Sequence, residues 1–126
     1  MITSSPLLKR LSFASFVRLL NQNTKDGSTC VIKFYSNGCG YCHRLKDAYD
    51  QISNEYKDIQ FFAFNIDGVE NISSFIDIHG VPSISLIKPG PTKPQISILE
   101  DPKEPNPFTW YRPAYIREFI EREANE

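Results

Sequence analysis

The fold of this chain is decided by residues 30–42, which read CVIKFYSNGCGYC. The first six residues, Cys30 to Tyr35, are mostly β-branched or aromatic, and this composition predicts a buried strand. Ser36 to Gly38 breaks that strand. A helix is expected to follow from about Cys39 to Tyr56, because apolar residues recur there at helical spacing: Leu45, Ala48, Tyr49 and Ile52. The stretch therefore predicts a strand, a short turn and a helix that begins with two cysteines.

Cys39 and Cys42 are expected at the start of that helix, where unpaired amides and the helix dipole stabilise an anion. Cys39 should therefore have a lowered pKa, and a thiolate rather than a thiol attacks a disulfide. Cys42 follows about one helical turn later, so the two sulfurs can meet. These positions predict a thiol–disulfide oxidoreductase in which Cys39 attacks, Cys42 resolves the mixed disulfide, and a Cys39–Cys42 disulfide results. Gly40 and Tyr41 would set the local geometry.

Two other interpretations of the cysteine pair remain open at this point. A Cys-x-x-Cys pair can be half of a zinc site, with His43 or His79 as further ligands, but structural zinc takes four ligands and the chain has no second cysteine pair. The pair can also be a purely structural disulfide, which a reducing compartment disfavours. We therefore expect no metal and no cofactor.

The rest of the chain alternates helices and strands. Ser12 is a suitable N-cap for a first amphipathic helix, and Pro113 suits the first position of a last one. Between these helices the sequence predicts strands over 59–66, 83–87 and 95–99, a short helix over 69–76, and an irregular proline-rich segment over 100–112. This order predicts an α/β fold with a mixed sheet, a hairpin, helices on both faces and an extra N-terminal helix.

Composition limits the classes of protein that the chain can represent. It has 126 residues and a net charge of −1, so we expect one domain over 1–126, with 100–112 as an inserted loop, and no field that would hold nucleic acid or a membrane. Met1 to Leu20 is better explained by an amphipathic helix than by a signal peptide, because Arg18 interrupts its apolar run. These features predict a cytoplasmic monomer in which Cys30 is a buried bystander.

Three short stretches near the predicted dithiol carry a resemblance to the thioredoxin family. They are Phe34-Tyr35-Ser36 before the cysteines, Asn65-Ile66-Asp67 at the end of the next strand, and Gly80-Val81-Pro82-Ser83. The resemblance covers about Ser12 to Glu121 and implies a thioredoxin fold in which Pro82 is cis and faces the dithiol. It also implies that the backbone of Val81 pairs with a substrate peptide beside Gly38, that protein disulfides are the substrates, and that an upstream reductase or oxidant is a partner.

The four residues CGYC do not match the usual motif of any one subfamily that the resemblance suggests. Thioredoxins usually have CGPC, disulfide isomerases CGHC and glutaredoxins CPYC. Tyr41 is similar to the glutaredoxin residue, but glutaredoxins have one more residue between the Tyr-Ser pair and the first cysteine. A glutathione-linked activity therefore stays an alternative, as does a thioredoxin-fold module that only binds a partner through Val81-Pro82 and the 100–112 loop.

The chain departs from the family at three positions near the dithiol. Gly38 stands where thioredoxins have a tryptophan, Lys33 where they have a buried acid, and Asp47 where many relatives have a helix-kinking proline. A buried Lys33 could accept a proton from Cys42 only if burial lowers its pKa enough to make it a base. A charged Lys33 would instead stabilise thiolates and make the couple more oxidising, whereas a Lys33 that snorkels to solvent would do neither. His43 and Arg112 are weaker candidates for shifting the pKa of the cysteines.

Overall fold

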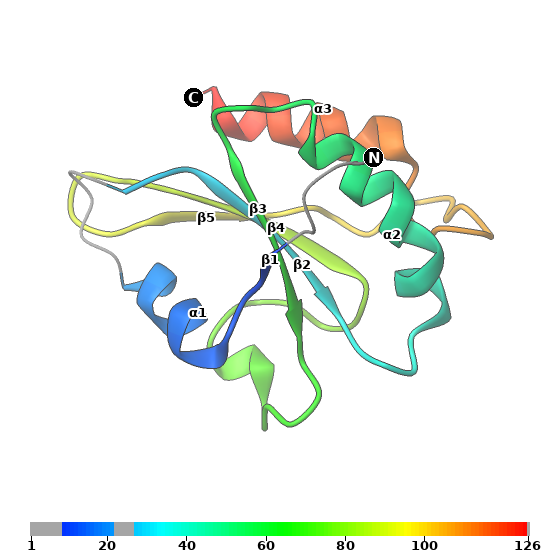
Figure 1. The fold of residues 1–126 in the computed structure, drawn as a ribbon, viewed down its shortest axis with the longest axis horizontal. Coiled ribbons are helices and arrows are strands. Elements are labelled where there is room, and N and C mark those ends of the chain that lie inside the picture. The colour runs from blue at the N-terminus through cyan, green and yellow to red at the C-terminus, as the bar shows by residue number, and fades with distance from the viewer. Residues whose placement is uncertain (1–8, 22–26, 126) are drawn as a thin grey trace, which may run out of the picture.

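The computed structural model describes residues 9–21 and 27–125, and within them it contains three α-helices, a 3₁₀ turn and five strands (Figure 1). The helices are α1 (Phe13–Leu20), α2 (Gly40–Ser53) and α3 (Pro113–Ala124), and the 3₁₀ turn is η1 (Ile72–Ser74). The strands are β1 (Lys9–Arg10), β2 (Cys30–Tyr35), β3 (Gln60–Asn65), β4 (Ser83–Lys88) and β5 (Gln95–Ile98).

The five strands form one mixed sheet in the order β1-β3-β2-β4-β5. β2 is central, runs parallel to β3 and antiparallel to β4, and β4 and β5 form the predicted hairpin. Helices α2 and α3 cover one face of the sheet, whereas α1 and η1 cover the other (Figure 1). The predicted α/β fold with a mixed sheet, helices on both faces and an additional N-terminal helix is therefore confirmed.

Alternation along β2 explains how the two layers are held together. Val31 contributes to the core under α2 and α3, whereas Ile32 and Phe34 contribute to the core under α1. All three side chains are fully buried, which is expected for a central strand covered on both faces. Since side chains alternate along a strand, Lys33 lies on the same face as Val31, beneath α2. The register of β2 therefore brings a lysine into the layer that carries the dithiol helix.

The structure differs from the predicted elements in three places. The two-residue edge strand β1 was not predicted, because Lys9 and Arg10 have no apolar alternation and pair only with Phe62 and Ala63 of β3. The predicted helix over 69–76 is reduced to η1. The proline-rich segment contains a backbone bridge between Asn106 and Trp110 where only irregular structure was predicted.

The predicted first helix is confirmed from Phe13 onward, with Ser12 as its N-cap. Met1 to Leu8, which belong to the segment weighed as a signal peptide, lie outside the described residues. Within the described residues, no helix is long and apolar enough to cross a membrane.

Candidate active site at the Cys39–Cys42 disulfide

Cys39 and Cys42 form a disulfide at the N-terminus of α2, with their Cα atoms 5.2 Å apart. Cys39 is the N-cap, and its Sγ accepts a hydrogen bond of 3.0 Å from the backbone N–H of Cys42. A sulfur in this position has an amide donor and the positive end of the helix dipole beside it, which stabilise a thiolate. Cys39 is 9% exposed and Cys42 only 2%, so Cys39 is the more accessible sulfur.

The Val81–Pro82 peptide bond is cis, which confirms the conformation that the resemblance implied. Pro82 immediately precedes β4, and β4 pairs with β2 through Ser83 and Phe34, close to the end of β2 that leads to the cysteines. The hydroxyl of Ser83 donates a hydrogen bond of 2.6 Å to the carbonyl of Gly80 and closes the turn around Pro82. The pairing of β4 with β2 therefore brings the cis-proline to the end of the sheet that carries the dithiol.

Gly38, directly before the cysteines, is exposed. A Cβ placed on it would meet no other atom within 4 Å. The position at which thioredoxins have a tryptophan therefore has room for a side chain, and the glycine leaves the backbone beside Cys39 accessible.

On the inner side of the disulfide, Cys42 and Lys33 both line a cavity of about 480 Å³ beneath α2. Lys33 is 4% exposed, and its Nζ lies 5.1 Å from the ring centroid of Tyr49. Burial lowers the pKa of Lys33 to about 8, although the charge of Asp50 acts in the opposite direction. The interpretation in which Lys33 snorkels to solvent is therefore wrong, because β2 is covered by α2 at this point.

Asp50 is a residue of this cavity that the sequence did not single out. Its Oδ2 accepts a hydrogen bond of 3.0 Å from Lys46. Its Oδ1 is buried and accepts no hydrogen bond from any described residue. Asp50 is two steps of four residues after Cys42 on α2, and this spacing could have indicated that the two side chains share a face.

On the outer side of the disulfide, Tyr41 contacts the segment that follows β5. The ring centroids of Tyr41 and Trp110 are 5.4 Å apart. The guanidinium carbon of Arg44 lies 5.0 Å from the centroid of the Tyr41 ring and 5.4 Å from that of Phe108, and Nε of Arg44 donates a hydrogen bond of 2.6 Å to the Phe108 carbonyl. The segment, drawn in orange, therefore lies beside the first turns of α2 (Figure 1). Neither Arg44 nor this contact was predicted, because no local pattern links residues so far apart.

A tight loop over 106–110 holds Trp110 in this position. Asn106 and Trp110 exchange two backbone hydrogen bonds of 3.0 and 2.9 Å, and Oδ1 of Asn106 accepts bonds from the amides of Phe108 and Thr109. Trp110 has a φ of 69°, a left-handed conformation that costs an L-residue about 1–2 kcal/mol. The hydrogen bonds of the loop must offset this cost, and they hold the backbone at Trp110 in this conformation.

Of the remaining candidates, only His43 shares a cavity with Cys42. His43 is exposed, and its Nε2 lies 2.9 Å from the carbonyl oxygen of Asn37. Arg112 is the exposed N-cap residue of α3 and lines neither cavity beside the dithiol, so its proposed effect on the cysteines stays a prediction. Cys30 is buried as expected, and burial raises its pKa to about 12. No group of three or more His, Cys, Asp or Glu in the described ranges is placed to hold a metal ion.

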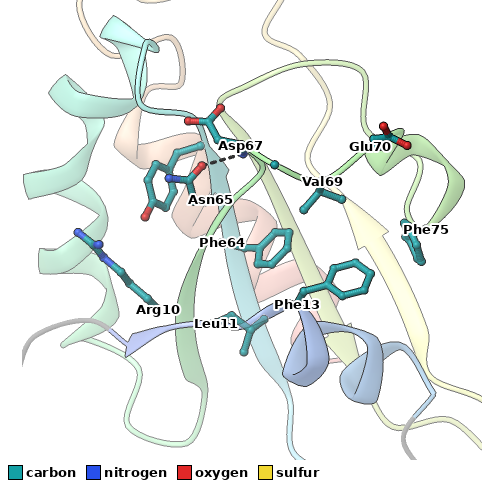
Figure 2. A pocket seen from close by; sticks show the side chains of 11 residues that line it. Arg10, Leu11, Phe13, Phe64, Asn65, Asp67, Val69, Glu70 and Phe75 are labelled. Carbon is teal, nitrogen blue, oxygen red and sulfur yellow. Dashed lines mark hydrogen bonds between the residues drawn. The ribbon is translucent and has the colours of Figure 1, made fainter.

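Another hollow, of about 600 Å³, lies between α1 and the end of β3 and includes neither cysteine (Figure 2). Phe13 and Phe75 meet edge to face in it, with ring centroids 5.3 Å apart. Asn65 accepts a hydrogen bond of 2.8 Å from the backbone N–H of Asp67, and Asp67 accepts one of 2.9 Å from the N–H of Asn37. This hollow is therefore linked to the dithiol only indirectly, because Asp67 anchors the loop that precedes Cys39.

A mixed sheet with a Cys-x-x-Cys disulfide at a helix start and a cis-proline at the same edge defines the thioredoxin-like class of proteins. The family model described as thioredoxin matches residues 8–106, which is most of the chain. The chain belongs to the thioredoxin family. The match ends before Phe108, Trp110 and α3.

Two curated relatives and one solved structure agree with this assignment. The thioredoxin of Borreliella burgdorferi is 35% identical over 69 residues, covering 54% of this chain and 58% of the relative. Thioredoxin-1 of Schizosaccharomyces pombe is 32% identical over 60 residues, covering 48% and 58%. The chain thus spans less than two thirds of the length of these relatives. Oxidised mitochondrial thioredoxin 3 of Saccharomyces cerevisiae superposes with a TM-score of 0.64 at 19% identity, covering 91% of this chain and 94% of that one, which supports the fold.

Proposed function

We propose that this protein is a thiol–disulfide oxidoreductase that acts on protein disulfides through Cys39 and Cys42. The observation that carries the proposal is the disulfide at the start of α2, in which the Sγ of the more accessible cysteine accepts an amide hydrogen bond. Membership of the thioredoxin family supports it further. We also propose that residues 1–126 act as one domain and as a monomer in the cytoplasm, with the 100–112 segment as a loop.

In the reducing direction, the Cys39 thiolate attacks one sulfur of a substrate disulfide. That disulfide breaks, a Cys39–substrate disulfide forms, and the second substrate sulfur leaves as a thiolate that takes up a proton. Cys42 then loses its proton and attacks Sγ of Cys39, which releases the other substrate thiolate and forms the Cys39–Cys42 disulfide. Two electrons pass to the substrate, and an upstream reductase must return them. In the opposite direction, the Cys39–Cys42 disulfide would accept two electrons from a substrate dithiol, and an upstream oxidant would then restore the Cys39–Cys42 disulfide.

The residues around the sulfurs have distinct proposed roles. Gly40 and Tyr41 set the geometry of the CGYC turn, and Gly38 leaves space for a substrate chain next to Cys39. The backbone of Val81, held before the cis-proline, would pair with that chain as an added strand. His43 would act at most through its charge, from an exposed position.

Lys33 and Asp50 are proposed to tune Cys42 from the inner cavity. A pKa of about 8 leaves Lys33 mostly charged at pH 7, and a nearby cation stabilises the thiolates of the reduced form. The couple should therefore be more oxidising than that of thioredoxin, whose potential is about −270 mV. Equilibration with glutathione tests this proposal, and a potential at or below the thioredoxin value would contradict it.

A Cys42→Ser variant tests whether the protein turns over disulfides or only binds a partner. An enzyme that attacks with Cys39 should accumulate mixed disulfides with its substrates, because nothing resolves them. The complexes should dissolve on addition of dithiothreitol and should be absent from the Cys39→Ser variant. Cys30→Ser is the matched control, since Cys30 is buried away from the site. A Cys42→Ser protein that traps no specific disulfide partner would favour the binding module instead.

A further inference from the structure

On the outer side of the disulfide, Trp110 lines a further cavity next to the cis-proline turn. This cavity has a volume of about 390 Å³ and is lined by Trp110, Val81 and Pro82, with the end of β5 opposite. Trp110 contacts Tyr41 of the CGYC turn as well, so one indole ring adjoins both the cysteine helix and the cis-proline turn. A substrate chain that pairs with Val81 beside Cys39 would therefore bring a neighbouring side chain to this cavity.

The rim of the cavity is acidic. Among the described residues that line it, Asp77, Glu100 and Asp101 are acidic and only His79 is basic. His79 lies 3.3 Å from Asp77 and offsets that carboxylate when it is protonated. Glu100 and Asp101 are exposed residues that follow β5 after Leu99, in the segment that leads to Trp110. The cavity thus combines an aromatic wall with net negative charge.

These two features suit one kind of side chain. A lysine ammonium or an arginine guanidinium is attracted to the face of a tryptophan ring and to nearby carboxylates, whereas an acidic side chain is repelled by the carboxylates. The apolar stems of both basic residues can pack on Pro82 and Trp110. The cavity on the other side of the disulfide has the opposite balance, with Arg10, Lys33 and Lys46 against Asp50.

We propose that Trp110, Glu100 and Asp101 form a specificity pocket that selects protein substrates with a lysine or arginine next to the reacting cysteine. This inference rests on the proposed oxidoreductase function and names its substrate class. The 106–110 loop supports it, because its backbone is held by hydrogen bonds and the Trp110 ring already contacts Tyr41. The family match ends at residue 106, so the pocket depends on a part of the chain outside that match.

The test uses three short peptides, each carrying one cysteine in disulfide linkage to thionitrobenzoate, with lysine, glutamine or glutamate on both sides of it. The protein is first reduced, and the released thionitrobenzoate is followed by absorbance. Because a flanking charge also alters the intrinsic reactivity of the disulfide, each rate is divided by the rate with dithiothreitol. For the wild type we expect the normalised rate with the lysine peptide to exceed that with the glutamate peptide about tenfold at low salt, and less at high salt.

Two variants and one control assign the preference to the pocket. Glu100→Gln combined with Asp101→Asn should reduce the preference for the lysine peptide at least about threefold. Trp110→Ala should lower the normalised rate more for the lysine peptide than for the other two peptides. Asp58→Asn removes an exposed carboxylate just before β3, at the opposite end of the parallel β2–β3 pair from the dithiol, and should leave the preference unchanged. The double variant alters exposed residues only, so it decides the matter even if Trp110→Ala does not fold.

Two results would overturn the inference, and they are distinguishable. Equal normalised rates for all three peptides, or a preference that the double variant leaves intact, would exclude the pocket while leaving the dithiol chemistry in place. A wild type that releases thionitrobenzoate from none of the peptides would overturn the proposed function, and the pocket with it.

Discussion

The two sides of the Cys39–Cys42 disulfide differ in charge, in burial and in the part of the chain that supplies them. The inner side includes Lys33 from β2 and Asp50 from α2, within residues that the family model matches. The outer side includes Trp110, which belongs to a loop beyond that match. Buried charges act on the stability of a thiolate, and exposed charges act on an approaching partner. On the proposed function, the inner side would therefore set the reduction potential and the outer side would choose substrates.

The sharpest test of this division is the reduction potential of two variants with opposite charge changes. Lys33→Met removes the cation beside Cys42 and should lower the potential by on the order of 30 mV, which corresponds to about 1.4 kcal/mol. Asp50→Asn removes the opposing carboxylate and should raise the potential. Equilibration with glutathione, read by the fraction of free thiol, measures both shifts.

Trp110→Ala serves as the matched comparison from the outer side. If the inner side alone sets the reduction potential, the potential of this variant should stay within a few millivolts of the wild-type value. The reason is that Trp110 is uncharged and contacts Tyr41 rather than a sulfur. Shifts of the same sign in Lys33→Met and Asp50→Asn, or a large shift in Trp110→Ala, would break the proposed division.

A second, smaller effect concerns the pH dependence of stability. Lys33 has a pKa of about 8 in the folded protein against 10.5 in the unfolded chain. Above pH 8 the unfolded state therefore holds a proton that the folded state has lost, so this residue makes stability rise with pH, by about 1 kcal/mol between pH 8 and 9. Urea unfolding of the wild type and of Lys33→Met at pH 8 and pH 9 measures this effect. The free energy of unfolding of the wild type minus that of the variant should show the rise.

That comparison needs the variant because Cys30 acts in the opposite direction. Burial raises the pKa of the Cys30 thiol from 9.0 to about 12, so its contribution to stability falls as the pH rises through 9. Cys30 is the same in both proteins and cancels in the difference. A difference that stays constant from pH 8 to 9 would mean that Lys33 is not buried as a titrating lysine.

The smallest expected effect concerns the attachment of the outer loop to α2. The guanidinium of Arg44 lies over the ring of Phe108, so Arg44→Ala and Phe108→Ala should not have additive effects on the free energy of unfolding. A double-mutant cycle should give a coupling of about 0.5–1 kcal/mol. Both side chains are exposed, and Phe108 is 62% exposed, so the individual losses should be small. A coupling of zero would indicate that the contact between the Arg44 guanidinium and the Phe108 ring contributes nothing, and that the hydrogen bond to the Phe108 carbonyl, which Phe108→Ala keeps, is the only link between these two residues that matters.

The chain by itself determined the α/β fold and the position of the dithiol. Residues 30–42 carry a dense apolar strand, a break and a helical repeat, and each of these patterns is local. Cys39 and Cys42 fall at a helix start for the same local reason, and Pro82 was expected in the cis form from the resemblance of the residues around it. Even β4 and β5 were predictable as a hairpin, because a proline- and glycine-containing turn links two adjacent strands.

Only the tertiary structure decided what surrounds the sulfurs. Lys33 is buried because α2 covers β2, and no pattern within β2 states whether its lysine reaches solvent. Trp110 lies 69 positions after Tyr41 in the chain, yet the two rings are 5.4 Å apart, because β5 and the 106–110 loop return the chain to α2. Local propensity acts over a few residues, whereas these contacts depend on how the sheet and its helices pack together, and so only the folded chain shows them.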